Sequence, residues 1–315
     1  MILALAGGVG GAKLAQGLSQ VLPSEDLAIV VNTGDDFEHL GFHISPDVDT
    51  VVYTLAGIAN PVTGWGVVDE SWSFMDALAR LGGETWFRLG DRDLATHVER
   101  TRLLSRGETL SEVTRRICAA LGVGAAVTPA SDDPVRTLVS TDEGELGFQH
   151  YFVRRQCAPR IVGLAYRDAE TARPAQLLGK PWTEQAITGA ILCPSNPYLS
   201  IAPILAIPAA RAWIERRAFP VVAVSPIVDG RALKGPAGKI MAELGEEPSA
   251  LGVARFYAGL VDVFVIDRSD AAMAGSIEAL GMETRVMDIV MRDLADRERL
   301  ARDIISLPVL LARAR

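Results

Sequence analysis

The sequence is poor in cysteine and has no excess of positive charge. Its three cysteines, Cys118, Cys157 and Cys193, are far apart and form no CxxC pair, so we expect scattered core residues rather than a disulfide framework or a zinc site. The 39 acidic residues outnumber the 31 basic ones, which gives a net charge of -8. A nonspecific nucleic-acid binder, or a protein that docks on anionic membranes, needs a clustered basic face. The charge balance argues against both classes and leaves room only for a local basic pocket.

A long uninterrupted hydrophobic run is also lacking. Residues 187–207 are the most apolar later stretch, but Pro194, Pro197 and Pro203 interrupt them, and a membrane span needs about 20 consecutive apolar residues. Residues 1–5 carry no positively charged side chain and lead directly into glycines, unlike a signal peptide. We therefore expect a cytoplasmic protein that does not enter a membrane.

Short aliphatic runs alternate with segments of helical periodicity. The runs expected to be strands are nearly continuous in apolar residues, as in strands covered on both faces. They are residues 2–6, 27–32, 191–194, 221–225 and 263–267, with a weaker pattern at 284–287. Helical patterns occupy residues 13–22, 110–121, 209–217 and 270–280. This alternation predicts an α/β fold, a Rossmann-like parallel sheet with flanking helices.

Two stretches interrupt the alternation. Residues 49–57 and 71–81 look helical and no sheet strand is evident between 57 and 121, which predicts a helical excursion. Residues 136–140 and 149–154 alternate in polarity like strands and flank a turn-rich segment. We therefore divide the chain into a Rossmann-like core, residues 1–125 and 187–315, and a small β-containing insertion, residues 126–186, that covers the substrate.

Four polar or glycine-rich loops, residues 7–11, 32–36, 194–197 and 225–230, each follow an expected strand. In an open parallel sheet, ligands bind at the carboxyl ends of the strands. The four loops are therefore predicted to meet at one active edge.

The first of these loops is glycine-rich. Glycines allow positive φ and close backbone approach, and a helix N-terminus presents free amides to an anion. We interpret Gly8, Val9, Gly10, Gly11 and Lys13 as a phosphate site, with a merely tight turn as the alternative. The loop is not a Walker A loop, because Ala12 and Leu14 occupy two of its required positions, and it lacks the GxGxxG spacing.

Two groups of carboxylates lie beside expected element ends. Asp35 and Asp36 follow the second strand, and Asp47 and Asp49 precede a helix. Carboxylate oxygens hold Mg²⁺, which also binds substrate phosphates, so we predict a metal site at Asp35 and Asp49. For one of Asp47 and Asp49, the alternative is a cap of the helix that starts at Thr50. His39 and His43 flank this loop, and their roles stay open.

Three further segments concentrate polar groups. Residues 88–97 include Arg88, which suits phosphate oxygens or an aromatic ligand, with a surface ion-pair network as the alternative. Asn196 stands between two prolines, with its amide available to a base or a ribose. Residues 235–239, which end in Lys239, suit either a second anion-binding loop or a plain turn.

Together these segments resemble the family of 2-phospho-L-lactate transferases, which act in the biosynthesis of the deazaflavin coenzyme F-420. The resemblance covers nearly the whole chain in the family's order, and its second, third and fourth stretches are the most specific. The stretches are AGGVGGAKL (6–14), NTGDD (32–36), ISPDVDTVVYTL (44–55), LGDRDLATH (89–97), SDDPV (131–135), PSNP (194–197) and, between residues 222 and 239, VAVSPIV and GPAGK.

The resemblance implies a phosphotransferase. The terminal ribityl hydroxyl of Fo, a riboflavin-like deazaflavin, attacks the distal phosphorus of a guanosine-diphosphate-activated three-carbon acid and releases GMP, with help from Mg²⁺. The family's Fo contacts fall on Asp49 and Arg88. The guanosine diphosphate falls on the glycine loop, Ser195, Asn196 and Lys239. Asp35, Asp36 and Asp49 are then the candidate catalytic residues, which hold the metal or take the hydroxyl proton.

The resemblance leaves several points open. The family uses phosphoenolpyruvate, 2-phospho-L-lactate or 3-phosphoglycerate, and the bacterial-looking sequence favours phosphoenolpyruvate. Relatives carry His-Gly or Ser-Gly where His39 is followed here by Leu40-Gly41, so the histidine roles stay open. The number of metal ions and the oligomeric state, a homodimer included, are not determined.

Two rival functions remain. One is a nucleotide-sugar-binding regulator of the gluconeogenesis-factor type, against which residues 89–97 and the PDVD motif argue. The other is a nicotinamide oxidoreductase. It needs an acidic residue at the end of the second strand to hold a ribose, and Asn32-Thr33 stands there instead.

Overall fold

A seven-stranded sheet forms the centre of the protein, whose computed structural model describes residues 1–232 and 235–311. Every neighbouring pair of strands is parallel, which confirms the predicted Rossmann-like α/β class. In spatial order the strands are β16 (Glu283–Met287), β15 (Val263–Asp267), β12 (Val221–Val224), β11 (Gly189–Leu192), β1 (Ile2–Ala6), β2 (Leu27–Val31) and β5 (Ala126–Pro129).

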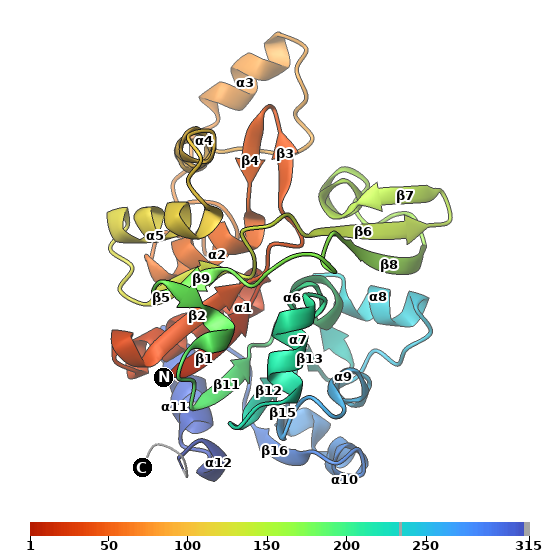
Figure 1. The fold of residues 1–315 in the computed structure, drawn as a ribbon. Helices are drawn as coiled ribbons and strands as arrows, with labels where there is room; N and C mark the ends of the chain where they lie inside the picture. The colour runs from red at the N-terminus through yellow and green to blue at the C-terminus, as the bar shows by residue number, and fades with distance from the viewer. Residues whose placement is uncertain (233–234, 312–315) are drawn as a thin grey trace.

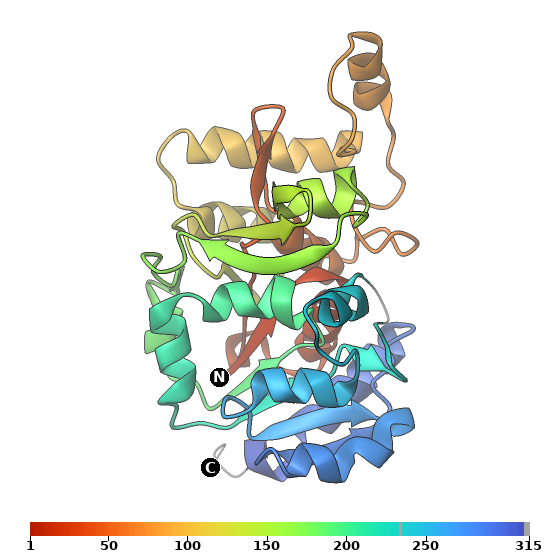
Figure 2. The same cartoon turned by 90° about the vertical axis from the view of Figure 1, so that its right-hand side faces the viewer.

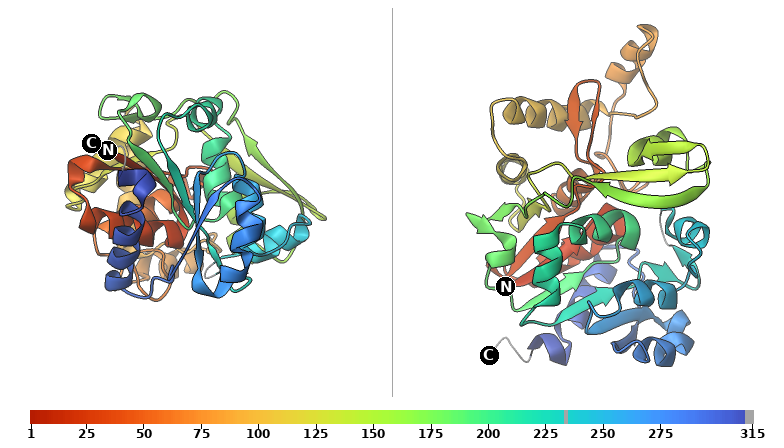
Figure 3. Two further views of the ribbon diagram at one scale, coloured as in Figure 1. Left: turned by 90° about the horizontal axis from the view of Figure 1, so that it is seen from below. Right: turned by 45° about the vertical axis from the view of Figure 1, so that its right-hand side comes forward.

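Helices cover both faces of this sheet, as the view from below shows (Figure 3, left). Successive residues of β1 pack into different cores, because side chains alternate across a strand: Leu3 and Leu5 belong to one core, Ala4 and Ala6 to the other. The core around Ala4 and Ala6 is covered by α1 (Gly8–Val21), α2 (Pro46–Leu55), α5 (Leu110–Ala120) and α11 (Leu294–Ile305). The opposite core is covered by α6 (Ala202–Leu205), α7 (Pro208–Glu215), α8 (Ala237–Glu243), α9 (Ala250–Tyr257) and α10 (Ala274–Glu278).

Two predicted helices begin earlier than expected. The helix predicted from residue 13 starts at Gly8, so the glycines form its first turn. The helix predicted from residue 49 starts at Pro46, where the fixed φ of proline suits a first helical position. As a result, the glycines of α1 and the carboxylates of Asp47 and Asp49 lie in the first turns of helices and not in the loops before them.

The predicted helical excursion projects beyond the sheet (Figure 1). It contains α3 (Ser73–Arg80) and α4 (Asp91–Leu104), and it packs with an unpredicted hairpin of β3 (Phe37–His39) and β4 (Phe42–Ile44). Ile44, Met75 and Leu89 form a small separate core there. The excursion therefore has apolar packing of its own beside the main domain.

The β insertion is a three-stranded antiparallel sheet of β6 (Arg136–Thr141), β7 (Gly144–Gly147) and β8 (Ile161–Arg167). Figure 2 shows it between the excursion and the helices that follow β11. The strand predicted over residues 149–154 is wrong: a π-helical turn, η2 (His150–Arg154), occupies that place. β5, expected inside the insertion, instead pairs with β2 at the edge of the main sheet.

The remaining elements are short. They are η1 (Ser24–Asp26), β9 (Gln176–Leu177), β10 (Lys180–Pro181), η3 (Trp182–Glu184), η4 (Pro197–Ile201), β13 (Ile227–Val228), β14 (Arg231–Ala232), η5 (Arg268–Met273) and α12 (Pro308–Leu311). Within the described ranges, no single helix is long and apolar enough to cross a membrane. Residues 197–205 and 208–215 pass that test only as a pair, and the two segments are bent by 91°.

Candidate functional site

A cavity of about 590 Å³ opens at the carboxyl edge of the sheet. The loops after β1, β2, β11 and β12 all contribute to it, as predicted from the order of strands and polar loops. The polar and glycine residues that line it from these loops and from the first turn of α1 are Gly7, Gly8, Gly10, Asp35, Ser195, Asn196 and Ser225. The rest of the lining comes from α2, the excursion, the insertion, residues 235–237 and residues 289 and 291.

The glycine segment is built for close backbone approach. A Cβ on Gly10 would lie 2.2 Å from the Pro194 carbonyl oxygen, and one on Gly11 would lie 2.3 Å from Ser195 Oγ. Gly8 has a φ of +60°, which favours glycine. Gly8, Val9, Gly10 and Lys13 line the cavity, and the first-turn amides of α1 point out of its N-terminus. Gly11 packs against Ser195 rather than lining the cavity.

Asp47 occupies part of this helix N-terminus. Its carboxylate accepts hydrogen bonds from the Gly8 amide (2.7 Å), Asn32 Nδ2 (2.9 Å) and Ser200 Oγ (3.2 Å). It therefore caps α1 and not α2, which corrects the capping alternative drawn from the sequence. Burial raises the pKa of Asp47 to about 6, against the effect of these three donors. The sequence indicates only a helix cap or a metal ligand at Asp47. It cannot indicate the bond to the Gly8 amide, because Gly8 lies 39 residues away.

Asp35 is a second buried carboxylate on the cavity wall. Its oxygens accept from Asn32 Nδ2 (3.3 Å) and Gln149 Nε2 (3.2 Å). Burial, and then the negative charges of Asp47 and Asp36, raise the pKa of Asp35 well above its ordinary value. A carboxyl group buried among other carboxylates tends to keep its proton unless a cation supplies the counter-charge.

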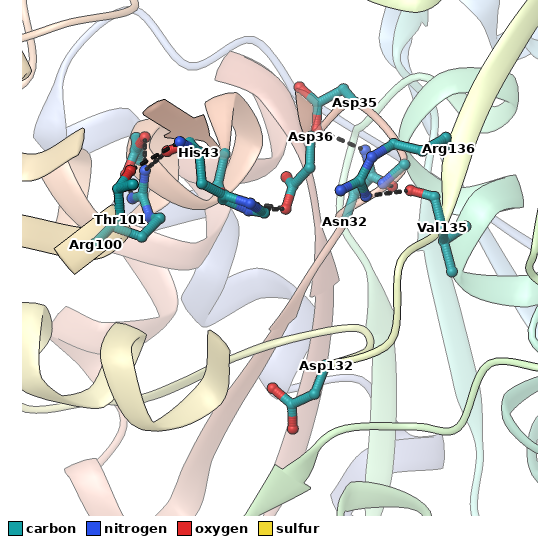
Figure 4. A network of polar contacts seen from close by, with 12 residues as sticks. Asn32, Asp35, Asp36, His43, Arg100, Thr101, Asp132, Val135 and Arg136 are labelled. Atoms are coloured by element: carbon teal, nitrogen blue, oxygen red, sulfur yellow. Dashed lines mark hydrogen bonds and ion pairs between the residues drawn. The ribbon is translucent and has the colours of Figure 1, made fainter. Parts of the chain in front are cut away.

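Asp36 points away from the cavity. Ser45 Oγ donates to its Oδ2 at 3.0 Å. His43 Nε2 lies 3.2 Å from the same oxygen, and Figure 4 shows His43 beside Asp36. Its Oδ1 is buried and has no hydrogen-bond partner among the described residues. Asp36 does not line the cavity, so the geometry does not favour the direct catalytic role predicted for it. Its negative charge still acts on Asp35.

Asp49 lines the cavity and is held by Arg100, which the sequence did not single out. Arg100 Nη1 donates to Asp49 Oδ2 at 3.1 Å, and Nη2 donates to the other oxygen. Both side chains are buried, and Arg100 is only 1% exposed. Burial raises the pKa of Asp49 while the charge of Arg100 opposes the shift. The two residues are 51 positions apart, so no local sequence pattern indicates that they form a pair.

A cluster that includes Asp49 has the residue types of a metal site. Ligand atoms of Asp49, Asp93 and His97 lie within 4.8 Å of one another. However, Tyr53 donates to Asp93 at 2.8 Å, His97 Nε2 lies 3.3 Å from Asp93, and the Arg100 cation already holds Asp49. A dication placed there would meet a buried positive charge. The neighbourhood of Asp35 and Asp47 fits a dication better, because no guanidinium or ammonium group is recorded in contact with either carboxylate among the described residues.

Apolar and aromatic side chains form another part of the cavity wall: Trp65, Trp86, Phe87, Phe148 and Phe152. Phe148 and Phe152 are stacked, with ring centroids 5.4 Å apart. Arg88 lines the cavity as predicted, and its guanidinium lies over the Trp72 ring at 3.9 Å. The same cavity thus combines charged groups with flat apolar surfaces, which suit a planar ring.

The remaining predicted site residues divide into two groups. Ser195 and Asn196 line the cavity; the Asn196 side-chain oxygen caps η4, and its Nδ2 is buried with no partner in the described part of the chain. Lys13 also lines it, and its ammonium group donates to the Met291 carbonyl at 2.8 Å. Lys239 does not line it. Its ammonium group contacts Tyr151, Pro159 and Glu243 and thus joins α8 to the insertion, so the geometry does not support the predicted phosphate role.

His39 and His43 lie outside the cavity lining. His39 is buried among Phe37, Trp86 and Phe87, and burial lowers its pKa. His43 contacts Asp36. His39 therefore supports the wall residues Trp86 and Phe87 from behind, whereas His43 supports Asp36 outside the lining.

The fold and the cavity define a Rossmann-like α/β protein with a site suited to a phosphorylated ligand and a cation. A family model described as 2-phospho-L-lactate transferase CofD matches residues 2–309, and the chain belongs to this family of transferases. A phosphoenolpyruvate transferase of Streptomyces griseus is 40% identical over 315 residues, covering 97% of this chain and 98% of the relative. A 2-phospho-L-lactate transferase of Methanosarcina acetivorans is 36% identical over 306 residues, covering 97% and 98%.

One solved structure with a similar fold is a member of the UPF0052 family from Bacillus halodurans. It aligns with a TM-score of 0.62 over 97% of this chain and 98% of its own length. The sequence identity is 15%, so the comparison shows a shared fold and nothing about the reaction.

Proposed function

We propose that this protein transfers a phospho-carboxylic acid from a guanosine-diphosphate-activated donor to the terminal ribityl hydroxyl of Fo and releases GMP, in the biosynthesis of coenzyme F-420. The observation that carries the proposal is the cavity itself. It joins the N-terminus of α1, buried carboxylates and an aromatic wall, in a chain similar over its full length to phosphoenolpyruvate and 2-phospho-L-lactate transferases.

The donor and the acceptor are assigned to different walls. The amides at the start of α1, with Ser195 and the unpaired Nδ2 of Asn196, suit the guanosine diphosphate. Trp86, Phe148 and Phe152 suit the flat deazaflavin ring, and Asp49 and Arg88 lie where they can bind its polar groups. Asp49, fixed by Arg100, is an acceptor for the ribityl hydroxyl and orients it for attack.

Asp35 is the carboxylate that best suits Mg²⁺, together with its neighbour Asp47. Asp49, the second predicted ligand, has both oxygens bound by Arg100 and offers only its remaining lone pairs. Mg²⁺ bound at Asp35 and Asp47 would neutralise the negative charge that develops on the phosphates of the donor. We expect the reaction in the cytoplasm, with no nucleic-acid partner.

Phosphoenolpyruvate is the favoured acid. Relatives named phosphoenolpyruvate transferase are 39–40% identical to this chain, and relatives named 2-phospho-L-lactate transferase are 35–39% identical. The difference is small, so the test must include every candidate acid.

The test is turnover of the purified protein with Fo, Mg²⁺ and a guanosine-diphosphate ester of phosphoenolpyruvate, 2-phospho-L-lactate or 3-phosphoglycerate in separate reactions. We expect GMP and the phosphodiester product by mass spectrometry, fastest with the phosphoenolpyruvate donor. Failure with all three donors, combined with tight binding of a uridine-diphosphate sugar, would instead support the regulatory alternative of the gluconeogenesis-factor type.

A further inference from the structure

Asp35 is held from two sides, once by the core and once by the insertion. Gln149 Nε2, from the insertion, donates to Asp35 Oδ2 at 3.2 Å. Asn32 Nδ2, from the loop after β2, lies 3.3 Å from Asp35 Oδ1, and it shares its two hydrogens among this oxygen, Asp47 Oδ2 (2.9 Å) and the Leu199 carbonyl (3.1 Å). Asn32 is fully buried and Gln149 is 6% exposed. Each carboxylate oxygen receives one of these amides, and an ionised carboxylate offers about four lone-pair sites. Gln149, with the shared contact of Asn32, therefore orients the carboxylate and leaves acceptor capacity for a cation.

The residue type at position 149 suits this arrangement. A lysine or arginine would place a positive charge on Asp35 and compete with a metal ion, whereas a neutral amide donates a hydrogen bond and leaves the negative charge in place. Among the described residues, the side chains that contact Asp35 are both amides. The two amides thus orient Asp35 without supplying a counter-charge.

Gln149 also belongs to the apolar wall. It lies between β7 and η2, and its neighbours Phe148, Phe152 and Val153 line the cavity. A second contact supports the same junction: the Thr137 amide of β6 donates to the Gly34 carbonyl at 2.6 Å. A Cβ on Gly34 would lie 2.7 Å from Thr137 Oγ1. The insertion and the Asp35 loop are therefore tightly joined.

We propose that Gln149 is a positioning residue that couples the cation site to the acceptor site; this inference rests on the proposed function. One hydrogen bond orients Asp35 towards the cation and sets the wall of Phe148 and Phe152 against the deazaflavin. Coupling of this kind is reciprocal: the cation strengthens Fo binding by the same factor by which Fo strengthens cation binding.

The test measures binding, not turnover. Mn²⁺ serves as the probe, because its free and bound forms are distinguished by electron paramagnetic resonance. Its affinity is measured with and without Fo on the full chain, in the wild type and in Gln149→Met. In the wild type we expect Fo to tighten Mn²⁺ binding by about 5- to 150-fold. In Gln149→Met we expect Mn²⁺ alone to bind about 10- to 100-fold more weakly, and the effect of Fo to fall to near onefold.

Gln156→Met is the matched control. Gln156 lines the same cavity from the same segment, and it has no recorded contact with Asp35. Whatever this substitution does to Fo affinity, the coupling factor should remain that of the wild type. Gln149→Ala provides the same comparison if methionine prevents folding, and thermal unfolding establishes which variants are folded.

The outcomes separate this inference from the proposed function. Unchanged Mn²⁺ affinity and unchanged coupling in a folded Gln149 variant, while Asp35→Asn abolishes Mn²⁺ binding, would overturn the role of Gln149 alone. Mn²⁺ binding that does not depend on Asp35, or a wild type that does not bind Fo, would overturn the proposed function and this inference with it.

Discussion

Arg100 and Asp49 form a buried ion pair in which both guanidinium Nη atoms contact the carboxylate, one at each oxygen. The pair links α4 of the excursion to α2 of the main domain. A charge buried in this way is tolerated because its partner and its hydrogen bonds are in place. The acceptor-binding carboxylate of the proposed reaction therefore depends on a residue outside the family motifs found in the sequence.

Replacement of Arg100 by methionine should strongly destabilise the fold. The substitution leaves Asp49 buried without its counter-charge, which costs about 3–5 kcal/mol in comparable pairs. Arg102→Met, on the same helix but in a surface pair with Glu99, should cost less than about 1 kcal/mol. Urea unfolding measures both. The double variant Arg100→Met with Asp49→Asn should be more stable than Arg100→Met alone; equal stability would contradict the pairing.

Mg²⁺ should stabilise the protein through Asp35. A ligand that binds only the folded state adds about 2.7 kcal/mol at 100 times its dissociation constant, so thermal unfolding should shift upwards with Mg²⁺ and return with a chelator. Asp35→Asn should lose this shift. Asp93→Asn should keep it, because Tyr53 donates to Asp93 and Arg100 already supplies a positive charge to Asp49 in the same cluster. The reverse result would place the cation in the cluster of Asp49, Asp93 and His97.

Asp47 should make the metal-free protein less stable as pH rises. Its pKa is about 6 in the folded state against 3.8 for an ordinary aspartate, so its stabilising proton is fully bound below pH 3.8 and is lost as pH rises through 6. The unfolding free energy of the wild type, relative to Asp47→Asn, should fall by up to about 3 kcal/mol from about pH 4 to about pH 7. Urea unfolding in a chelating buffer measures the difference. A difference that stays flat or grows with pH would show that Asp47 is not buried as described.

Phe152→Ala should weaken acceptor binding. Phe152 is 38% exposed and stacks on Phe148 at the cavity wall, so its removal costs little stability. An aromatic contact contributes about 0.5–1.5 kcal/mol beyond its area, and we expect KM for Fo to rise about tenfold with kcat and donor KM nearly unchanged. Val162→Ala, on the outer strand β8 and 57% exposed, is the control. A selective rise in the KM for the donor would contradict this assignment and would indicate that the aromatic wall binds the donor instead of Fo.

Gly10→Ala should disturb the junction of α1 and β11. The added Cβ would meet the Pro194 carbonyl oxygen at 2.2 Å, and overpacking of this kind costs about 1–3 kcal/mol. Donor affinity should fall with it, because Gly10 and Pro194 both line the cavity. Gly275→Ala, in α10 with nothing within 4 Å of the new Cβ, should be neutral or stabilising by up to about 1 kcal/mol. Equal effects of the two substitutions on unfolding would argue against the close approach.

Local sequence patterns predict the central strands of the sheet, but they do not predict the edge strand β5 or the π-helical turn of the insertion. The doubly covered strands were predictable because runs such as residues 27–31 are continuously apolar. β5 lies in the range predicted for the insertion, where the sequence pattern changes; the strand is four residues long and ends in Pro129, and its place at the edge of the main sheet comes from tertiary packing. Residues 149–154 alternate in polarity, yet they form a π-helical turn that buries Tyr151. Periodicity over six residues cannot separate these two structures.

For the site, the sequence was informative where a motif is contiguous and failed where partners are distant. The glycine segment, Asp35, Asp49 and Asn196 were found from their loops and do line the cavity. The bonds of Asp49 to Arg100 and of Asp35 to Gln149 span 51 and 114 residues, so tertiary packing alone creates them. Lys239 had the residue type expected for phosphate, but Glu243, one helical turn later, and the insertion hold its ammonium group.

The carboxylate of Asp47 at the start of α1 changes what this helix can attract. A free diphosphate approaching the amide-rich end would face a fixed negative charge there. A nucleotide that arrives already chelated to a divalent ion carries its own neutralising charge. We therefore expect the chelate, rather than the bare nucleotide, to be the species that this protein admits.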